Sequence, residues 1–287
     1  MSFTLEIDPV TCITCGKCVR VCPANIFVQP RSHSEVKVRN KENCIQCGHC
    51  VAVCPTDSVK HSLFPPGKIH PIDRTLLPTP EQMLLLIRSR RSNRAFSKRP
   101  VPQEYLDQIL EAAYRAPTAS NQQELEFTLV TDPELLQQII RITVDVFEEK
   151  VKLINNPVIG GILKRIMPEN YRMVSRLNRL VETVRKGKDL ILREATSVLF
   201  IHTAPEEYYG LIDANLAYQN GSLMAESLGV SQFYTGFVCR AIHEDKKNRI
   251  NKLLGIEGKI HAGLAMGMPS FTYPNYMDKK PMVVKKL

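Results

Sequence analysis

The chain has 287 residues, of which 44% are hydrophobic and 23% are charged, and its formal net charge is +9 at pH 7. This composition excludes a fibrous or disordered chain, and the length predicts about two domains. Because no run of about 18 apolar residues occurs, we expect no transmembrane helix. The first residues lack the basic and apolar regions of a signal peptide, so we expect a cytoplasmic protein with reduced thiols.

The cysteines are concentrated near the N-terminus, where the motif Cys-x-x-Cys-x-x-Cys-x-x-x-Cys-Pro occurs twice. The eight motif cysteines are Cys12, Cys15, Cys18, Cys22, Cys44, Cys47, Cys50 and Cys54. The close spacing lets three thiolates reach one cubane cluster, while the fourth cysteine of such a motif ligates the other cluster. Zinc sites usually show two separated Cys-x-x-Cys pairs, and disulfides are disfavoured in the cytosol. The motif therefore indicates two [4Fe–4S] clusters.

With this repeat, residues 1–62 resemble the bacterial ferredoxins that carry two [4Fe–4S] clusters. The resemblance implies that each cluster takes three cysteines from one motif and one from the other. One cluster would be held by Cys12, Cys15, Cys18 and Cys54. The other would be held by Cys44, Cys47, Cys50 and Cys22. The ninth cysteine, Cys239, lies far from the motif and is expected to be a small buried hydrophobe.

A proline-rich stretch, residues 63–79, follows this domain and is expected to be a stiff linker, because prolines at this density block helices and inner strands. After it, apolar periodicity and turn residues predict alternating helices and strands. The expected helices begin after Thr79, Pro102 and Asp132 and span 208–228 and 244–254. The expected strands span 125–130, 197–202, 233–238 and 260–266. Residues 141–190 are expected to be a helical insertion or cover. This order predicts an α+β fold for residues 80–287.

A basic run, Arg90-Arg91-Ser92-Asn93-Arg94, follows the first of these helices. Such a run is usually a solvated surface, although guanidinium groups and a hydroxyl also suit a phosphate monoester. Together with Phe96, the run resembles the Arg-Arg-Ser-x-Arg-x-Phe motif that opens the FMN-dependent nitroreductase family. Further segments resemble that family in the same order along the chain. They are residues 116–123, 213–229, 234–237, 267–269 and 279–281.

The resemblance covers residues 80–287 and departs from the family at Glu124-Leu125, where Pro-Trp is usual. It implies a central, mostly antiparallel sheet flanked by helices, a homodimer and one FMN. The residues implied for the FMN phosphate are Arg90, Ser92, Arg94 and Lys279, with Arg91 nearby and Lys280 as the alternative to Lys279. Those implied for the ribityl chain and the ring are Pro117, Thr118 and Ala119, with Asn121 bonded near N3/O4 or N5. The N1/O2 edge would receive the backbone N–H groups of Thr235 and Gly236, which would stabilise the negative charge of a reduced flavin.

These two resemblances predict an oxidoreductase in which electrons pass singly through the clusters to FMN and then to a small-molecule acceptor. The implied acceptor is a nitroaromatic, a quinone or a similar conjugated compound, and the chemistry is expected at flavin N5 with no catalytic side chain assigned. The electron donor would be a reduced ferredoxin-like protein or NAD(P)H, although the chain lacks a Gly-x-Gly-x-x-Gly motif. The alternative is an electron-transfer or redox-sensing module that serves a partner protein. Net charge alone is weak evidence for nucleic-acid binding, which we do not expect.

Overall fold

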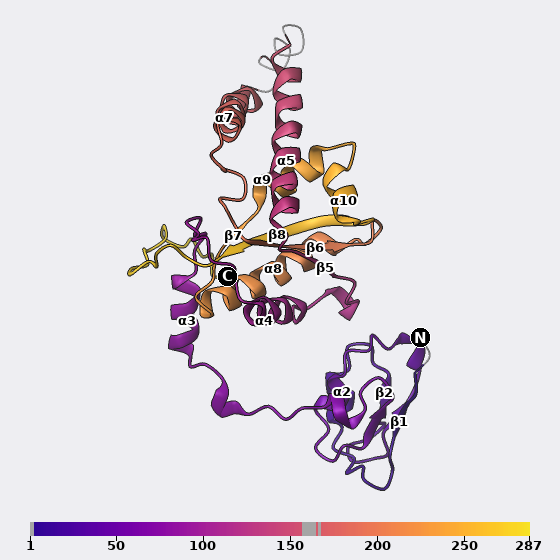
Figure 1. The fold of residues 1–287 in the computed structure, drawn as a ribbon. Helices are drawn as coiled ribbons and strands as arrows, with labels where there is room; N and C mark the ends of the chain where they lie inside the picture. Colours follow the sequence, from indigo (N-terminus) through magenta and orange to yellow (C-terminus); the bar gives the residue numbers. More distant parts are fainter. Residues whose placement is uncertain (1–2, 157–164, 166–167) are drawn as a thin grey trace. The chain divides into compact units, whose positions relative to one another are not determined.

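The computed structural model describes residues 3–156, 165 and 168–287. The chain forms two compact units, of which unit 1 comprises residues 1–77 with 119–123, and unit 2 comprises residues 78–118 with 124–287 (Figure 1). Most of the expected linker is exposed, from residue 65 onward, and it contains only short 3₁₀ turns, Pro66–Lys68 and Arg74–Leu76. Each unit has a hydrophobic core of its own.

Unit 1 is built from two small antiparallel sheets and two short helices. The helices begin at equivalent positions of the two cysteine motifs. Its elements are β1 (Leu5–Ile7), α1 (Lys17–Val21), β2 (Phe27–Val28), β3 (Lys37–Val38), α2 (His49–Ala52) and β4 (Val59–His61). Strand β1 pairs with β4, and β2 pairs with β3. Gly16 and Gly48 precede the two helices at φ values of 67° and 70°, a conformation that glycine adopts without steric cost. The two cysteine motifs therefore share one local structure.

Unit 2 has a four-stranded sheet at its centre, and all its pairings are antiparallel. The strands are β5 (Glu126–Val130), β6 (Ser197–Thr203), β7 (Ser231–Tyr234) and β8 (Lys259–Gly267), in the order β5-β6-β8-β7. The helices are α3 (Pro80–Ser89), α4 (Gln103–Tyr114), α5 (Pro133–Ile154), α7 (Pro168–Arg185), α8 (Gly210–Ser227), α9 (Gly236–Glu244) and α10 (Arg249–Leu254). The α+β fold class expected from the sequence is confirmed.

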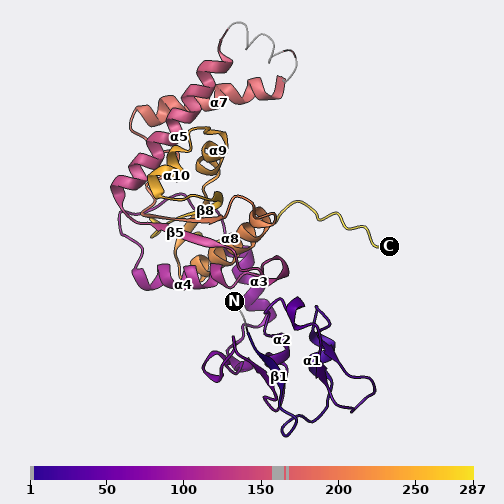
Figure 2. The ribbon, with the colours of Figure 1, turned by 90° about the vertical axis from the view of Figure 1, so that its right-hand side faces the viewer.

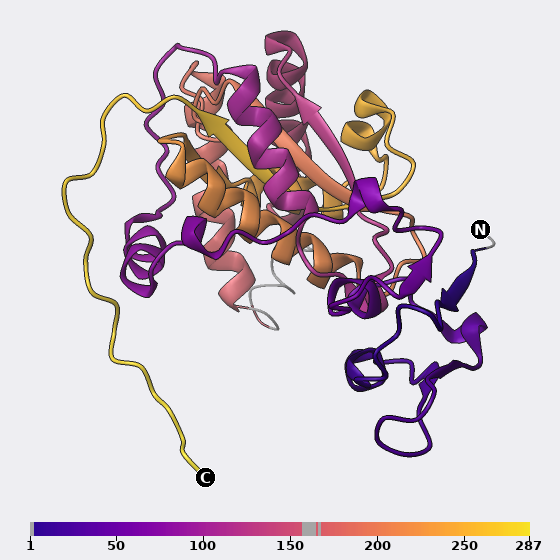
Figure 3. The same ribbon diagram turned by 90° about the horizontal axis from the view of Figure 1, so that it is seen from below.

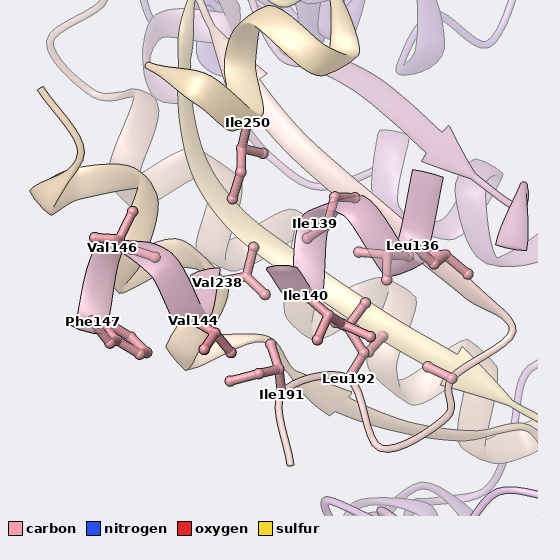
Figure 4. Close-up of a cluster of buried hydrophobic side chains, with 14 of the residues drawn as sticks. Leu136, Ile139, Ile140, Val144, Val146, Phe147, Ile191, Leu192, Val238 and Ile250 are labelled. Carbon is pink, nitrogen blue, oxygen red and sulfur yellow. The ribbon is translucent and has the colours of Figure 1, made fainter. Parts of the chain in front are cut away.

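Helices cover both faces of this sheet, which is why β6 is buried along its whole length. Helices α4 and α8 lie on one side of the sheet, and α5, α9 and α10 lie on the other (Figures 1 and 2). Alternate residues of β6 enter the two cores, so that Val198 and Phe200 pack with α5 and α9 while Leu199 and Ile201 pack with α4 and α8. Figure 4 shows the core beneath α5.

Helix starts were predicted well where a side chain caps them. Thr79 and Gln82 form the expected capping box at α3, with Thr79 Oγ1 accepting from the Gln82 N–H at 3.3 Å. Asp132 caps α5 by accepting from the N–H groups of Glu134 and Leu135. The helical segment expected at residues 141–190 consists of the end of α5 and of α7, which pack on each other, while 157–164 and 166–167 lie outside the described residues.

Two expected elements were wrong in part. The apolar run 233–238 was expected to be a strand, but β7 ends at Tyr234 and α9 begins at Gly236. A short apolar run does not distinguish strand from buried helix, and here Val238 and Ala241 face the core with helical spacing. The helix expected over 244–254 begins only at Arg249, because Asp245 accepts from the backbone N–H groups that follow it and ends α9.

Among the residues described, no helix is long and apolar enough to cross a membrane.

Candidate functional site

The eight motif cysteines line two cavities in unit 1. One cavity is lined by Cys12, Cys15, Cys18 and Cys54, and the other by Cys22, Cys44, Cys47 and Cys50. The two cavities are similar in size. Each combines three cysteines of one motif with the last cysteine of the other, which is the grouping that the ferredoxin resemblance implies. The donor set of each cavity fits a cubane cluster.

A cubane cluster in either cavity would bind its four thiolates through four different iron atoms. In the part of the chain that the structure describes, no group of three or more His, Cys, Asp or Glu side chains lies close enough to hold one metal ion.

Two of the thiols receive hydrogen bonds from neighbouring N–H groups. The Cys44 Sγ accepts from the N–H of Gln46 at 3.4 Å, and the Cys54 Sγ accepts from the N–H of Ser58 at 3.3 Å. Burial would raise the pKa of Cys54, but the N–H donors of the turn that follows it together lower that pKa. Burial raises the pKa of Cys50 to about 12. Since cluster ligands are thiolates, cluster insertion has to displace that proton.

In unit 2, the basic run Arg90–Arg94 is attached to the edge strand β7. Ser92 forms a parallel bridge with Gln232, and the Asn93 Nδ2 donates to the Ser231 Oγ at 2.7 Å. Gln232 is only 1% exposed, and its Nε2 donates to the carbonyl of Arg91. These contacts hold the run beside the strand that leads into α9.

The arginines of the run have different contacts. The Arg91 Nη2 donates to the carbonyl of Asn275 at 3.1 Å, and its guanidinium carbon lies 4.7 Å from the ring centroid of Tyr273. Arg91 is therefore engaged by the segment that follows β8. Arg90 and Arg94 instead lie near the hydroxyl of Tyr218 on α8, where burial raises the pKa of Tyr218 and the two positive charges oppose that rise. The guanidinium of Arg94 also lies over the ring of Phe233, with its carbon 5.3 Å from the ring centroid. Guanidinium groups and a hydroxyl are groups that can bind a phosphate.

Tyr218 lies beside the basic run, and the sequence analysis did not single it out. Its hydroxyl donates to the Gln232 Oε1 at 3.3 Å, so it joins α8 to the strand that holds the basic run. Its ring meets that of Tyr234 edge to face at a centroid distance of 4.9 Å. In the sequence, Tyr218 falls within the segment 213–229 that resembles the family, at a position to which the resemblance assigns no role.

The N–H groups expected at the flavin N1/O2 edge are not equivalent. The N–H of Thr235 donates to the carbonyl of Gly263 at 2.9 Å and so belongs to the sheet. Gly236 begins α9, and the first N–H groups of a helix have no acceptor within it and lie at its positive end. Thr235 Oγ1 lies 3.5 Å from the Sγ of Cys239, which is half-buried rather than fully buried as expected from the sequence. Of the expected pair, Gly236 is the backbone donor that suits an anionic ring edge.

The segment that contains Ala119 and Asn121 belongs to a different unit from the rest of the implied flavin residues. Pro117 and Thr118 belong to unit 2, whereas residues 119–123 belong to unit 1. Within unit 1, the Asn121 Nδ2 donates to the carbonyls of Ile45 at 3.0 Å and Gln46 at 3.1 Å. Both protons of its amide are thereby used.

The last implied residues, Lys279 and Lys280, lie in the chain that follows β8. This chain has no regular secondary structure beyond residue 274, and every residue from 270 to 287 is exposed. It runs as an extended tail away from the sheet (Figures 2 and 3). The Arg91 contacts with Tyr273 and Asn275 anchor the start of this tail, before the lysines.

Comparisons with known families and proteins agree with this division of the chain. Residues 87–268 match the nitroreductase family, and residues 4–55 match a 4Fe-4S dicluster domain. A protein of Archaeoglobus fulgidus, provisionally named NADH dehydrogenase/NAD(P)H nitroreductase, is 41% identical over 59 residues. That match covers 21% of this chain and 34% of the relative, so the chain matches about a third of the relative's length.

Two solved structures resemble this chain in fold. A nitroreductase with bound FMN from Bacteroides fragilis has a TM-score of 0.55 and 18% identity, covering 71% of this chain and 99% of that one. A nitroreductase with bound FMN from Desulfitobacterium hafniense has a TM-score of 0.52 and 21% identity, covering 70% and 97% respectively. The nitroreductase match spans more than half of the residues. The chain therefore belongs to the nitroreductase family and carries a 4Fe-4S dicluster domain on the N-terminal side of its nitroreductase domain.

Proposed function

We propose that this protein is an oxidoreductase with two [4Fe–4S] clusters and one FMN, which delivers electrons to a small conjugated acceptor such as a nitroaromatic or a quinone. Electrons enter singly at the ferredoxin-type unit and leave in pairs from the nitroreductase unit. The observation that carries this proposal is the presence, in one chain, of two four-cysteine cavities and a nitroreductase fold in which the basic run Arg90–Arg94 is attached to β7.

The chain's own residues have binding and orienting roles in this proposal. When bound, FMN supplies an isoalloxazine ring that accepts electrons one at a time and gives up two together. Arg90, Ser92 and Arg94 bind its phosphate, and Lys279 or Lys280 joins them from the tail. Arg91 fixes that tail through Tyr273 and Asn275. Gly236 directs its N–H and the positive end of α9 toward the N1/O2 edge of the ring.

The remaining implied residues line the ring. Pro117, Thr118 and Ala119 border the ribityl chain or the isoalloxazine. Thr235 packs its side chain beside the ring, because its N–H donates to Gly263 within the sheet. Asn121 is the residue that the resemblance assigns to the ring near N3/O4 or N5. The electron donor is a reduced ferredoxin-like protein or NAD(P)H.

We also propose that the protein acts as a homodimer, as the family resemblance implies. Helices α3 and α8, which contact each other, expose large apolar side chains within unit 2. Leu85 on α3 is 56% exposed, and Leu211 and Ile212 on α8 are 57% and 58% exposed. Large apolar side chains exposed on neighbouring helices are typical of an interface.

The electron route is tested by removing the clusters without touching the flavin domain. In the double variant Cys12→Ser/Cys44→Ser, each cavity loses one ligand, so turnover with a ferredoxin-like donor should stop. Chemically reduced FMN in the same variant should still reduce a nitroaromatic in anaerobic stopped-flow experiments. Cys239→Ser, which changes the cysteine outside the motif, is the control and should keep both activities.

Full turnover of the cluster-free variant with the same donor would refute the relay. Slow, unsaturable reduction of every acceptor by the intact protein would instead identify an electron-transfer module that serves a partner protein. Metal and flavin analysis of the purified protein, with about eight Fe and one FMN per chain expected from the ligand sets, checks the cofactor content directly.

A further inference from the structure

One histidine outside the ligand sets lies against a cluster ligand. The Nε2 of His61, the last residue of β4, is 3.9 Å from the Cys44 Sγ. The same side chain lines the cavity that Cys22, Cys44, Cys47 and Cys50 share. His61 is only 4% exposed, so its ring belongs to the interior of unit 1.

The hydrogen bonds of the ring determine which nitrogen carries the proton. The Nδ1 of His61 accepts from the backbone N–H of Leu63 at 3.3 Å. A ring nitrogen that accepts a hydrogen bond carries no proton, so in the neutral imidazole the proton is on Nε2. The nitrogen that faces the Cys44 sulfur is therefore the donor.

The ring is also held in place by packing. Phe3 stacks on it at a centroid distance of 4.8 Å and an interplanar angle of 12°. Phe64 packs edge to face at 5.0 Å and 70°. The backbone of His61 is paired with Leu5 of β1, so both main chain and side chain are fixed. The direction of Nε2–H is thus set by the fold.

The other cavity has no equivalent imidazole among the residues described. There, Cys54 has the Thr56 hydroxyl at 3.8 Å, and that hydroxyl also contacts the Ser58 hydroxyl at 2.7 Å. Either hydroxyl can be the donor in that pair, so the Thr56 O–H can donate to the Ser58 oxygen instead of to the Cys54 sulfur. The two cavities therefore differ in the side-chain donor that faces a ligand sulfur.

We infer that His61 tunes the cluster held by Cys22, Cys44, Cys47 and Cys50 by donating Nε2–H to the Cys44 sulfur, which raises the reduction potential of that cluster. A hydrogen bond to a ligand sulfur stabilises the added negative charge of the reduced cluster. The inference rests on the proposed cluster content. It adds that the two clusters differ in reduction potential. Added electrons then populate the cluster beside His61 in preference to one that lacks this donor.

The test is an EPR-monitored redox titration of the full-length holoprotein and of His61→Phe. Phenylalanine keeps an aromatic ring between Phe3 and Phe64 but has no donor. At a fixed ambient potential, the reduced-to-oxidised ratio of one cluster should fall several-fold, where tenfold corresponds to about 59 mV for a one-electron couple. The other cluster should be unchanged. His61→Gln, which restores an N–H donor, should recover part of the loss.

His49→Phe is the matched control, because His49 lines the same cavity but is exposed. Unchanged potentials in His61→Phe at full iron content, or an equal shift in His49→Phe, would overturn the inference. The wild-type protein labelled with ¹⁵N-histidine gives a second test that needs no variant. A weak nitrogen coupling to one reduced cluster is expected, and its absence from both would contradict the hydrogen bond. If the purified protein binds no iron at all, the proposed function fails instead.

Discussion

Neighbouring arginines of one basic run have separate tasks in this protein, although the sequence presents them as equivalent. Arg90 and Arg94 lie near the Tyr218 hydroxyl, whereas Arg91 contacts Tyr273 and Asn275. The motif predicted the residue types needed for a phosphate. It did not predict that Arg91 contacts a different segment from Arg90 and Arg94, because Asn275, which accepts the Arg91 hydrogen bond, is 184 positions away in the sequence.

This division predicts different effects of two matched substitutions. Arg94→Gln removes a charge from the proposed phosphate site and should raise the dissociation constant of FMN about tenfold or more, since a charge-assisted hydrogen bond contributes about 1.5–3 kcal/mol. Arg91→Gln should weaken FMN binding less and should increase proteolysis of the tail. Fluorescence titration with FMN and limited trypsin digestion measure the two effects. Equal FMN affinities in the two variants would contradict the assignment.

Tyr218 shows why part of the site was missed at the residue scale. A tyrosine on a helix is most often a packing residue, and its hydroxyl gains a role only when β7 brings Gln232 to it. We expect Tyr218→Phe to weaken FMN binding about fivefold, because Gln232 loses a buried partner worth about 1 kcal/mol. Isothermal titration with FMN measures this loss, and Tyr208→Phe, at a position 85% exposed, is the control. An unchanged affinity in Tyr218→Phe would remove Tyr218 from the site.

At the scale of elements, side-chain caps decided where sequence reasoning succeeded and where it failed. Thr79 and Asp132 precede their helices and were recognised as starts. Asp245 lies inside an apparently continuous helical pattern, yet it ends α9 by accepting from the N–H groups of Lys247 and Arg249. Local polar groups that compete with the helix are hard to recognise when the apolar periodicity continues past them.

Asp245 also gives the α9–α10 junction a dependence on pH. Burial would raise its pKa, but the hydrogen bonds from Arg249 and Lys247 outweigh that and hold the pKa below its ordinary value of 3.8. A carboxylate whose pKa is lower in the folded state stabilises the fold above its unfolded pKa, and this contribution is lost as the pH falls through the folded pKa. Stability of unit 2 should therefore decline below about pH 4.

We expect Asp245→Asn to lower the free energy of unfolding of unit 2 at pH 7 by about 1–3 kcal/mol, since a buried charge-assisted network is broken. The variant should also lose less stability than wild type between pH 6 and pH 3. Urea unfolding followed by far-UV circular dichroism at both pH values measures this. Asp107→Asn, at an exposed position on α4, is the control and should behave as wild type. An unaltered pH dependence in Asp245→Asn would refute the assignment.

For the whole molecule, the sequence predicted the two-part organisation because each part carries its own unmistakable pattern. The cysteine repeat identified one unit, and the ordered motifs identified the other. The membership of residues 119–123 in unit 1 was not predictable, since their motif matches the nitroreductase pattern while Asn121 bonds to Ile45 and Gln46. Contacts between segments distant in the sequence leave no trace in local composition.

The exposed apolar surface of α3 and α8 yields a prediction about assembly. Ile212→Glu/Leu216→Glu places two charges on the exposed face of α8, where the side chains are 58% and 43% exposed in a single chain. The variant should sediment as a monomer if two copies meet there, because a buried unpaired charge costs several kcal/mol. Analytical ultracentrifugation measures the mass, with Tyr208→Glu as a control near the same helix. A variant that stays dimeric would place the interface elsewhere.

The order of strands in the sheet of unit 2 has a consequence for biosynthesis. Strand β8 lies between β6 and β7 and is the last of the four to be translated. Until residues 259–267 leave the ribosome, β6 can pair only with β5, and its other edge keeps unpaired backbone N–H and C=O groups. The apolar side chains of β6, which are all buried in the finished fold, stay partly uncovered for the same time. Unit 1, whose β1 and β4 pair within the first 61 residues, has no such delay. The nascent protein can thus pair the strands of its dicluster domain long before the sheet of unit 2 can close.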